Sequence, residues 1–127
     1  MINFCKLAVA LIALLMGGWL TFDGTRAFIT GDYVTPKSGP HAGQLGPWSA
    51  VFSTIGIDPR STPAKAIHVI VGACWLAALG LFFMKSPIGW YALAASSVLS
   101  LWYLPIGTAL GVVELILLFL PQLKRFA

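Results

Sequence analysis

The strongest constraint on the fold is a series of long apolar runs with almost no charge. Residues 7–22 contain no charged side chain. Over the whole chain 58% of the residues are hydrophobic, only 9% are charged, and the mean hydropathy is +0.87. A soluble domain carries roughly 25% charged residues, and a water-facing surface cannot be covered with so few. We therefore expect an integral membrane protein.

Turn residues divide the apolar sequence into four expected transmembrane helices in a single domain, residues 1–127. The expected spans are about 5–22, 64–84, 88–104 and 107–123. A helix of about 20 residues covers the hydrocarbon core of about 30 Å. The first span resembles a signal peptide, and we expect it to be retained as a membrane helix. A rival interpretation joins residues 88–120 into one kinked helix of about 50 Å, which is too long without strong tilt. The fold class predicted is therefore an all-α membrane protein, a four-helix transmembrane bundle.

The connector between the first two spans, residues 23–63, differs in composition. It is about 40 residues long and holds three of the four acids and most of the prolines. Within it, Pro47 and Gly56 suit the start and the cap of a short amphipathic helix. One apolar stripe is expected on this helix, formed by Trp48, Val51, Phe52 and Ile55. Such a helix lies flat in the headgroup region, or it packs as a lid on the ends of the transmembrane helices. The sequence leaves both open. A small hairpin-like turn is expected at residues 31–32.

Charge gives a weak guide to orientation. Four spans place both termini on one side, with four positive residues on each side of the membrane (Lys6, Lys85, Lys124 and Arg125 against Arg26, Lys37, Arg60 and Lys65). This count is a tie, so the positive-inside rule alone does not decide. A retained signal-like first helix favours an N-terminus inside the cell. We expect a bacterial inner membrane protein with both termini cytoplasmic and the connector extracytoplasmic.

Glu114 is the acid that most suggests chemistry, because it lies in an otherwise uncharged apolar run. An ionised carboxylate in hydrocarbon costs several kcal/mol, so such residues are functional-site candidates. At helical spacing Glu114 shares a face with Gly107 and Gly111, a small-residue pair that favours close helix packing. We expect it to join a polar intramembrane cluster in the outer half of the bundle, which has six members: Glu114, His68, Lys65, Ser96, Ser100 and Thr108.

Two interpretations of this cluster remain open. Counted from the expected helix ends, Glu114 and His68 lie at similar depths, so His68 or Lys65 is its expected partner. A buried Glu beside a His is suited to moving protons or binding cations. The same pair can also fix helix register without doing chemistry. The third span has one small, polar face that favours tight packing, formed by Gly89, Ala92, Ser96 and Ser100. The serines on that face are expected to donate to the carboxylate.

The sequence contains no motif for a familiar enzyme. It lacks zinc-protease, serine-hydrolase, phosphate-loop and dinucleotide signatures, and Cys5 and Cys74 have no metal-ligand spacing. No metal site is expected, and a cofactor shared with a partner chain is left open. The scattered positive residues do not form a nucleic-acid surface. The expected partners are the lipid bilayer and other membrane subunits, or further copies of the chain.

Three functions follow, in order of preference. The first is a non-catalytic accessory or structural subunit of a larger membrane complex. The second is a small homo-oligomeric channel or transporter with Glu114 in the permeation or proton path. The third is a membrane redox or cofactor-binding component near His68.

Overall fold

The computed structural model describes residues 2–124, in which all regular secondary structure is helical. The helices are α1 (Ile2–Thr30), α2 (Trp48–Thr54), α3 (Thr62–Phe83), α4 (Gly89–Leu99), α5 (Ile106–Leu118) and α6 (Pro121–Lys124). The all-α prediction is therefore confirmed for this part of the chain. Met1 and residues 125–127, including Arg125, lie outside the described residues.

Two of these helices are long and apolar enough to cross a membrane. They cover Phe4–Thr30 and Thr62–Phe83, with mean hydropathies of 1.9 and 2.2 in their most apolar stretches. Only 39% and 33% of those stretches are buried inside the protein. A helix at the core of a soluble protein would instead be mostly covered by its own chain.

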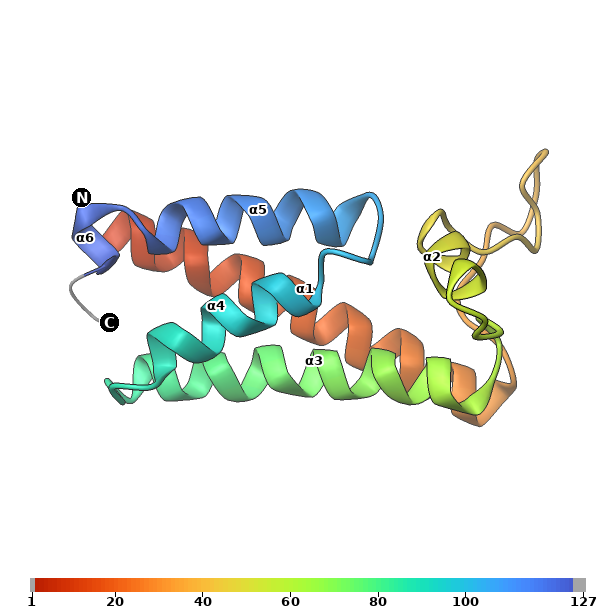
Figure 1. The fold of residues 1–127 in the computed structure, drawn as a ribbon, viewed down its shortest axis with the longest axis horizontal. Coiled ribbons are helices and arrows are strands. Elements are labelled where there is room, and N and C mark those ends of the chain that lie inside the picture. The colour runs from red at the N-terminus through yellow and green to blue at the C-terminus, as the bar shows by residue number, and fades with distance from the viewer. Residues whose placement is uncertain (1, 125–127) are drawn as a thin grey trace.

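The four main helices pack in a ring. α1 contacts α3, α3 contacts α4, α4 contacts α5, and α5 returns to α1. Figure 1 shows these helices along the long axis of the molecule, with α6 at one end and α2 at the other. Side chains at the centre of the ring include Val9, Met16, Trp75 and Leu93, each at most 1% exposed.

α1 extends further than its sequence predicts. Asp23 and Gly24 were expected to end the helix, and a hairpin-like turn was expected after them. The helix instead continues to Thr30, so the expected helix end is wrong. The chain does bend at residues 31–32, where Gly31 has a φ of 97°, but the bend follows a helix and does not join two strands. The reason for the longer helix is tertiary packing. At Gly24 an added Cβ would lie 2.9 Å from the Cβ of His68, so the missing side chain brings α3 close to α1. Asp23 does not terminate the helix, because its Oδ1 accepts a hydrogen bond from Val34 N at 2.7 Å.

α4 and α5 are shorter than the expected spans of residues 88–104 and 107–123. They contain 11 and 13 residues, which gives them lengths of about 16 and 20 Å. The turn between them lies beside the middle of α1, since Trp19 Nε1 donates to Tyr103 Oη at 2.7 Å. α1 and α3 therefore continue past this turn.

The connector covers the space beyond the α4–α5 turn, where α1 and α3 stand alone (Figure 1). Trp48 and Phe52 of α2 are buried, whereas Val51 is half-buried and Ile55 is 65% exposed. α2 therefore packs on the protein as a lid through two of its four apolar residues. The Trp48 ring lies 6.1 Å from each of the Trp102 and Tyr103 rings, between centroids.

Candidate functional site

The structure buries Glu114 without the expected partners. Its side chain is 0% exposed, and neither carboxylate oxygen has a hydrogen-bond partner among the described residues. Lys65 instead donates to the carbonyl of Gly31 at 3.3 Å, near the connector. His68 Nδ1 bonds to the carbonyl of Ala64 at 2.8 Å. The predicted pairing of Glu114 with His68 or Lys65 is therefore wrong.

Glu114 does not meet His68 or Lys65 because of its position along the helix axis, which the contacts of its neighbours define. On one side of it along α5, an added Cβ at Gly111 would lie 2.8 Å from Ser97 O. On the other side, Trp90 Nε1 donates to Leu118 O at 2.9 Å. Glu114 therefore lies beside the section of α4 between Trp90 and Ser97.

The same section of α4 faces the part of α3 that is remote from His68. Gly89 packs on the backbone of Phe82, and Trp75 Nε1 donates to Ser100 Oγ at 2.6 Å. Residues 90–97 thus face residues 75–82. His68 is about ten residues nearer the connector than the middle of that stretch, or about 15 Å along the helix axis. The depth estimate from the sequence failed because it placed the α4–α5 turn level with the start of α3.

The remaining members of the predicted cluster bond elsewhere. Ser100 Oγ donates to Ser96 O at 3.0 Å while accepting the Trp75 bond. Thr108 Oγ1 donates to Leu101 O at 2.6 Å. The expected serine hydrogen bonds to Glu114 are thus not made. Gly107 and Gly111 lie where α5 meets α4: Gly107 packs on Ser100 and Tyr103, and Gly111 packs on Ser97. Ala92 is half-buried on α4. The six residues therefore do not form one cluster, and the Glu114 carboxyl group is left without a hydrogen-bond partner among the described residues.

His68 is enclosed by five aromatic rings, which the sequence did not predict as a group: Tyr33, Trp48, Phe52, Trp102 and Tyr103. The centroid distances run from 4.5 to 6.1 Å, the usual range for aromatic packing. His68 is 0% exposed, and its Nε2 has no hydrogen-bond partner among the described residues. We call these six residues the aromatic cluster. It joins the connector to α3 and to the α4–α5 turn.

Ion pairing and hydrogen bonds fasten the connector around this cluster. Arg60 Nε donates to Asp32 Oδ1 at 3.0 Å, and Arg60 also donates to Gly43 O at 2.9 Å. Burial raises the pKa of Asp32, but the hydrogen bonds from Arg60 and from Tyr33 N outweigh it and leave the pKa below its usual value. Tyr33 Oη donates to Pro59 O at 2.8 Å. Burial, and then the nearby carboxylates of Asp23 and Asp32, raise the pKa of Tyr33.

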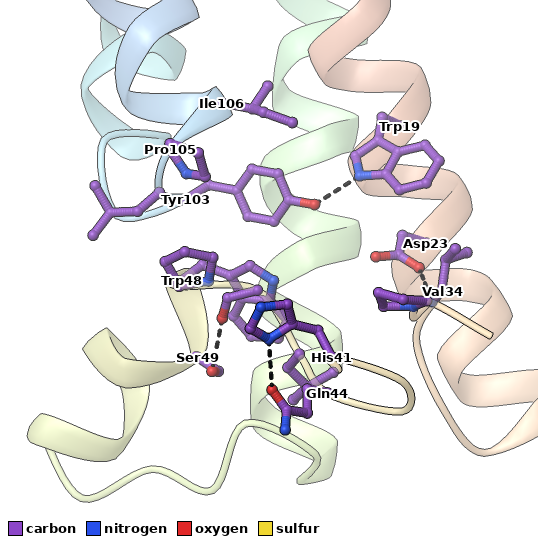
Figure 2. A pocket seen from close by; sticks show the side chains of 15 residues that line it. Trp19, Asp23, Val34, His41, Gln44, Trp48, Ser49, Tyr103, Pro105 and Ile106 are labelled. Carbon is purple, nitrogen blue, oxygen red and sulfur yellow. Dashed lines mark hydrogen bonds between the residues drawn. The ribbon is translucent and has the colours of Figure 1, made fainter. Parts of the chain in front are cut away.

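A pocket of about 650 Å³ opens beside the aromatic cluster, between α1, the connector and the α4–α5 turn. Figure 2 shows Trp19 and Tyr103 along one side, Asp23 and Val34 on another, and His41 with Gln44 across the opening. Sequence reasoning missed Asp23, Trp19 and Tyr103 as site residues. The sequence feature that could have indicated this site was Asp23, an acid directly after a run of sixteen uncharged residues, 7–22.

The described residues contain no group of three or more His, Cys, Asp or Glu placed to hold a metal ion. Cys5 and Cys74 are free thiols, the first buried and the second half-buried. His41 is exposed in the connector, bonds to Gln44 at 3.1 Å and lines this pocket, whereas His68 is buried.

Comparison with known proteins adds no relative, because no family model, no curated protein and no solved structure matches the chain.

Proposed function

We propose that the chain is a multi-pass integral membrane protein in which α1, α3 and the α4–α5 pair all enter the bilayer. The support is the distribution of exposed apolar side chains. Leu14 and Leu15 on α1 are 53% and 61% exposed, Ile70 on α3 is 59% exposed, and Ile116 on α5 is 59% exposed. Large apolar surfaces of this kind are rare on soluble monomers, whereas a bilayer covers them at no cost.

The α4–α5 pair sets the depth of the protein in this arrangement. Each of its helices is shorter than the hydrocarbon core of about 30 Å. Trp19, Trp102 and Tyr103 gather at its turn, and aromatic residues of this type favour the membrane–water interface. We place the outer interface at this level, with local thinning of the bilayer. The final turns of α1 and the first turns of α3 then extend into the headgroup region under the connector. Together the four helices form the transmembrane bundle, with the connector as its extracytoplasmic cap.

The orientation proposed is that of a bacterial inner membrane protein with cytoplasmic termini. Lys6, Lys85 and Lys124 belong to the end of the molecule remote from the connector, where the described residues include no acid. Positive residues at short loops and helix ends favour the cytoplasmic side. The connector end mixes positive residues with Asp23, Asp32 and Asp58, which gives it little net charge.

Within the membrane, we propose that the protein is a non-catalytic subunit of a larger assembly. One observation carries this proposal. Ala73, Ala77 and Gly80 lie at helical spacing on one face of α3, and all three are exposed. An added Cβ at Gly80 would meet nothing within 4 Å. In lipid, small residues favour helix association because they let backbones approach closely. A second transmembrane helix from a partner subunit fits this face.

A bulky residue on that face should block the partner. We expect the tagged wild-type protein, extracted in mild detergent from the cells that make it, to co-purify with other membrane chains. Ala77→Trp should lose those chains. Ala109→Trp is the matched control, since Ala109 is an exposed alanine on α5, and it should keep them. Native mass spectrometry gives the composition. A monomeric wild-type particle, or an Ala77→Trp particle with its partners intact, would refute the subunit proposal.

A particle that contains only copies of this chain would instead favour the homo-oligomeric alternative. The channel version of that alternative needs Glu114 on a wet axis between copies. Its side chain is buried within one chain, so this observation does not favour it. The redox alternative depended on His68, whose ring is surrounded by aromatic residues of the same chain.

A further inference from the structure

We propose that the pocket beside Asp23 binds an organic ammonium group, such as a choline or an ethanolamine. This site goes beyond the subunit function proposed above and does not depend on a partner chain. Its volume of about 650 Å³ lies in the range of small-molecule sites, which are mainly apolar and have few polar groups.

Three aromatic side chains give the pocket its surface chemistry. Trp19, Trp48 and Tyr103 line it from α1, from α2 and from the α4–α5 turn. The face of an aromatic ring carries partial negative charge, so aromatic-lined sites are suited to ammonium groups. The Trp19 N–H is already engaged with Tyr103 Oη at 2.7 Å (Figure 2). The indole of Trp19 therefore offers a ligand its ring and no donor.

Asp23 supplies the one carboxylate in the pocket lining. One oxygen accepts the Val34 N–H, and Figure 2 shows the other directed toward the space below Tyr103. The lining includes neither lysine nor arginine. The nearest basic residue along α1, Arg26, is not part of the lining, and its Nη1 donates to Asp32 O at 3.0 Å. A carboxylate among aromatic rings favours a cation and disfavours an anion.

The composition of the pocket lining explains why a cation with an apolar exterior suits the pocket better than a metal ion. Methylated ammonium groups are weakly hydrated and bury methyl surface against rings. A metal ion needs several oxygen ligands, and the pocket lining offers one carboxylate. Because the opening lies near the proposed outer interface, the ammonium group can come from a lipid headgroup or from a free amine in solution.

Binding can be tested with choline and its neutral isostere, 3,3-dimethyl-1-butanol, on protein purified in a non-ionic detergent. Tryptophan fluorescence should change saturably with choline, and the isostere should bind about tenfold more weakly or worse, because it has the shape without the charge. Equal binding of the two compounds, or no saturable choline response, would overturn the proposal.

Two variants separate the charge of Asp23 from its structural bond. Asp23→Asn keeps an oxygen for the Val34 N–H and should weaken choline binding by about tenfold or more, as for loss of a charged partner. Asp58→Asn removes an exposed connector acid outside the pocket lining and should leave binding unchanged. Thermal unfolding of both variants checks the fold. Undiminished choline affinity in a folded Asp23→Asn protein would contradict the assignment.

Lipid analysis of the same preparations identifies the source of the ligand. Enrichment of phosphatidylethanolamine or phosphatidylcholine over phosphatidylglycerol in the wild type, with loss of the enrichment in Asp23→Asn, assigns a lipid headgroup. Choline binding without such enrichment assigns a free amine.

Discussion

At the scale of single residues, a buried hydrogen bond inside the helix ring ties α3 to the end of α4. Trp75 is 0% exposed, and its indole N–H has Ser100 Oγ as acceptor at 2.6 Å. A buried donor that loses its partner costs about 1–3 kcal/mol. Since Trp75 fills the middle of the ring, this single bond also fixes how α3 and α4 are aligned.

Ser100→Ala should therefore destabilise the protein by about 1–3 kcal/mol, because the Trp75 N–H is left without an acceptor. Ser97→Ala is the matched control. Ser97 is equally buried, but its hydroxyl donates to Leu93 O within its own helix, a carbonyl that the helix ladder can also satisfy. Its loss should cost less than about 1 kcal/mol. Unfolding in a detergent mixture, followed by tryptophan fluorescence, measures both, and equal effects would show that the Trp75 bond is not the decisive one.

The second residue-scale prediction concerns pH and the Asp32–Arg60 pair. The pKa of Asp32 lies below its ordinary value of 3.8 in the folded protein, so the fold favours the ionised carboxylate. Its contribution is complete above the unfolded pKa and is lost as pH falls through the folded pKa. We expect the connector of the wild type to loosen as the pH drops below about 3.8.

Hydrogen exchange of residues 31–46, measured across this pH range, reports the loosening. Asp32→Asn should expose the connector already at neutral pH and flatten the pH dependence. The pair is about half exposed, so its effect should be local, with the helix ring intact. An unchanged acid transition in Asp32→Asn would assign the pH dependence to another group.

At the scale of elements, α1 and α3 pack closely because glycines replace side chains along their contact. At Gly72 an added Cβ would lie 2.6 Å from Thr21 N and 3.0 Å from Gly17 O. Both of those atoms are backbone, which cannot move away as a side chain can. The helices are therefore held at a separation that excludes even a methyl group at this point.

Gly72→Ala should cost about 1–3 kcal/mol, the usual penalty for overpacking. Gly80→Ala in the same helix meets nothing within 4 Å and should stabilise the protein by roughly 0.5–1 kcal/mol through helix propensity. Melting temperatures in detergent compare the two variants with the wild type. Equal tolerance of both alanines would mean that α1 and α3 are further apart than this packing requires.

The elements also show what the sequence can and cannot predict. Apolar runs and breakers indicated helices at residues 64–84 and 107–123, because those signals are local. The first matches α3, and the second is divided between α5 and α6. The extension of α1 to Thr30 depended on Asp23 bonding to Val34 and on α3 packing at Gly24, contacts that no local pattern contains. The same holds for α2: its stripe was visible, but only the folded chain shows that Trp48 and Phe52 face His68 while Ile55 faces outward.

At the scale of the whole molecule, the main error in the predicted site was the level assigned to the α4–α5 turn along the bundle. The break near Pro105 was readable from the sequence, but its level beside Trp19 was not, since that level depends on how far α4 and α5 extend along α1. The sequence therefore predicted that Glu114 and His68 form a pair, whereas they lie about 15 Å apart along the helix axis. Asp23 was overlooked for a different reason. The sequence assigned it to the turn after the first span, whereas the structure places it in the wall of a pocket.

Labelling from the two sides of the membrane tests the proposed placement of the whole molecule. In a background with Cys5 and Cys74 replaced by alanine, an impermeant maleimide applied to intact spheroplasts should label Ser38→Cys in the connector. Ser86→Cys, in the α3–α4 turn, should react only after the membrane is opened, because we place this turn on the cytoplasmic side with the termini. The reverse pattern would invert the topology, and labelling of both from outside would remove α3 from the membrane.

Leu104→Cys then tests how deep the α4–α5 turn lies. Leu104 is 37% exposed, so a thiol there can react if water reaches it. With the turn at the outer interface, as proposed from Trp19, Trp102 and Tyr103, the impermeant reagent should label it from outside. Val112→Cys, 43% exposed on α5, is the control and should stay unlabelled in hydrocarbon. If Leu104→Cys is as unreactive as Val112→Cys, the turn ends inside the bilayer. The connector lid would then have to enter the membrane with it, because Trp48 packs on Tyr103.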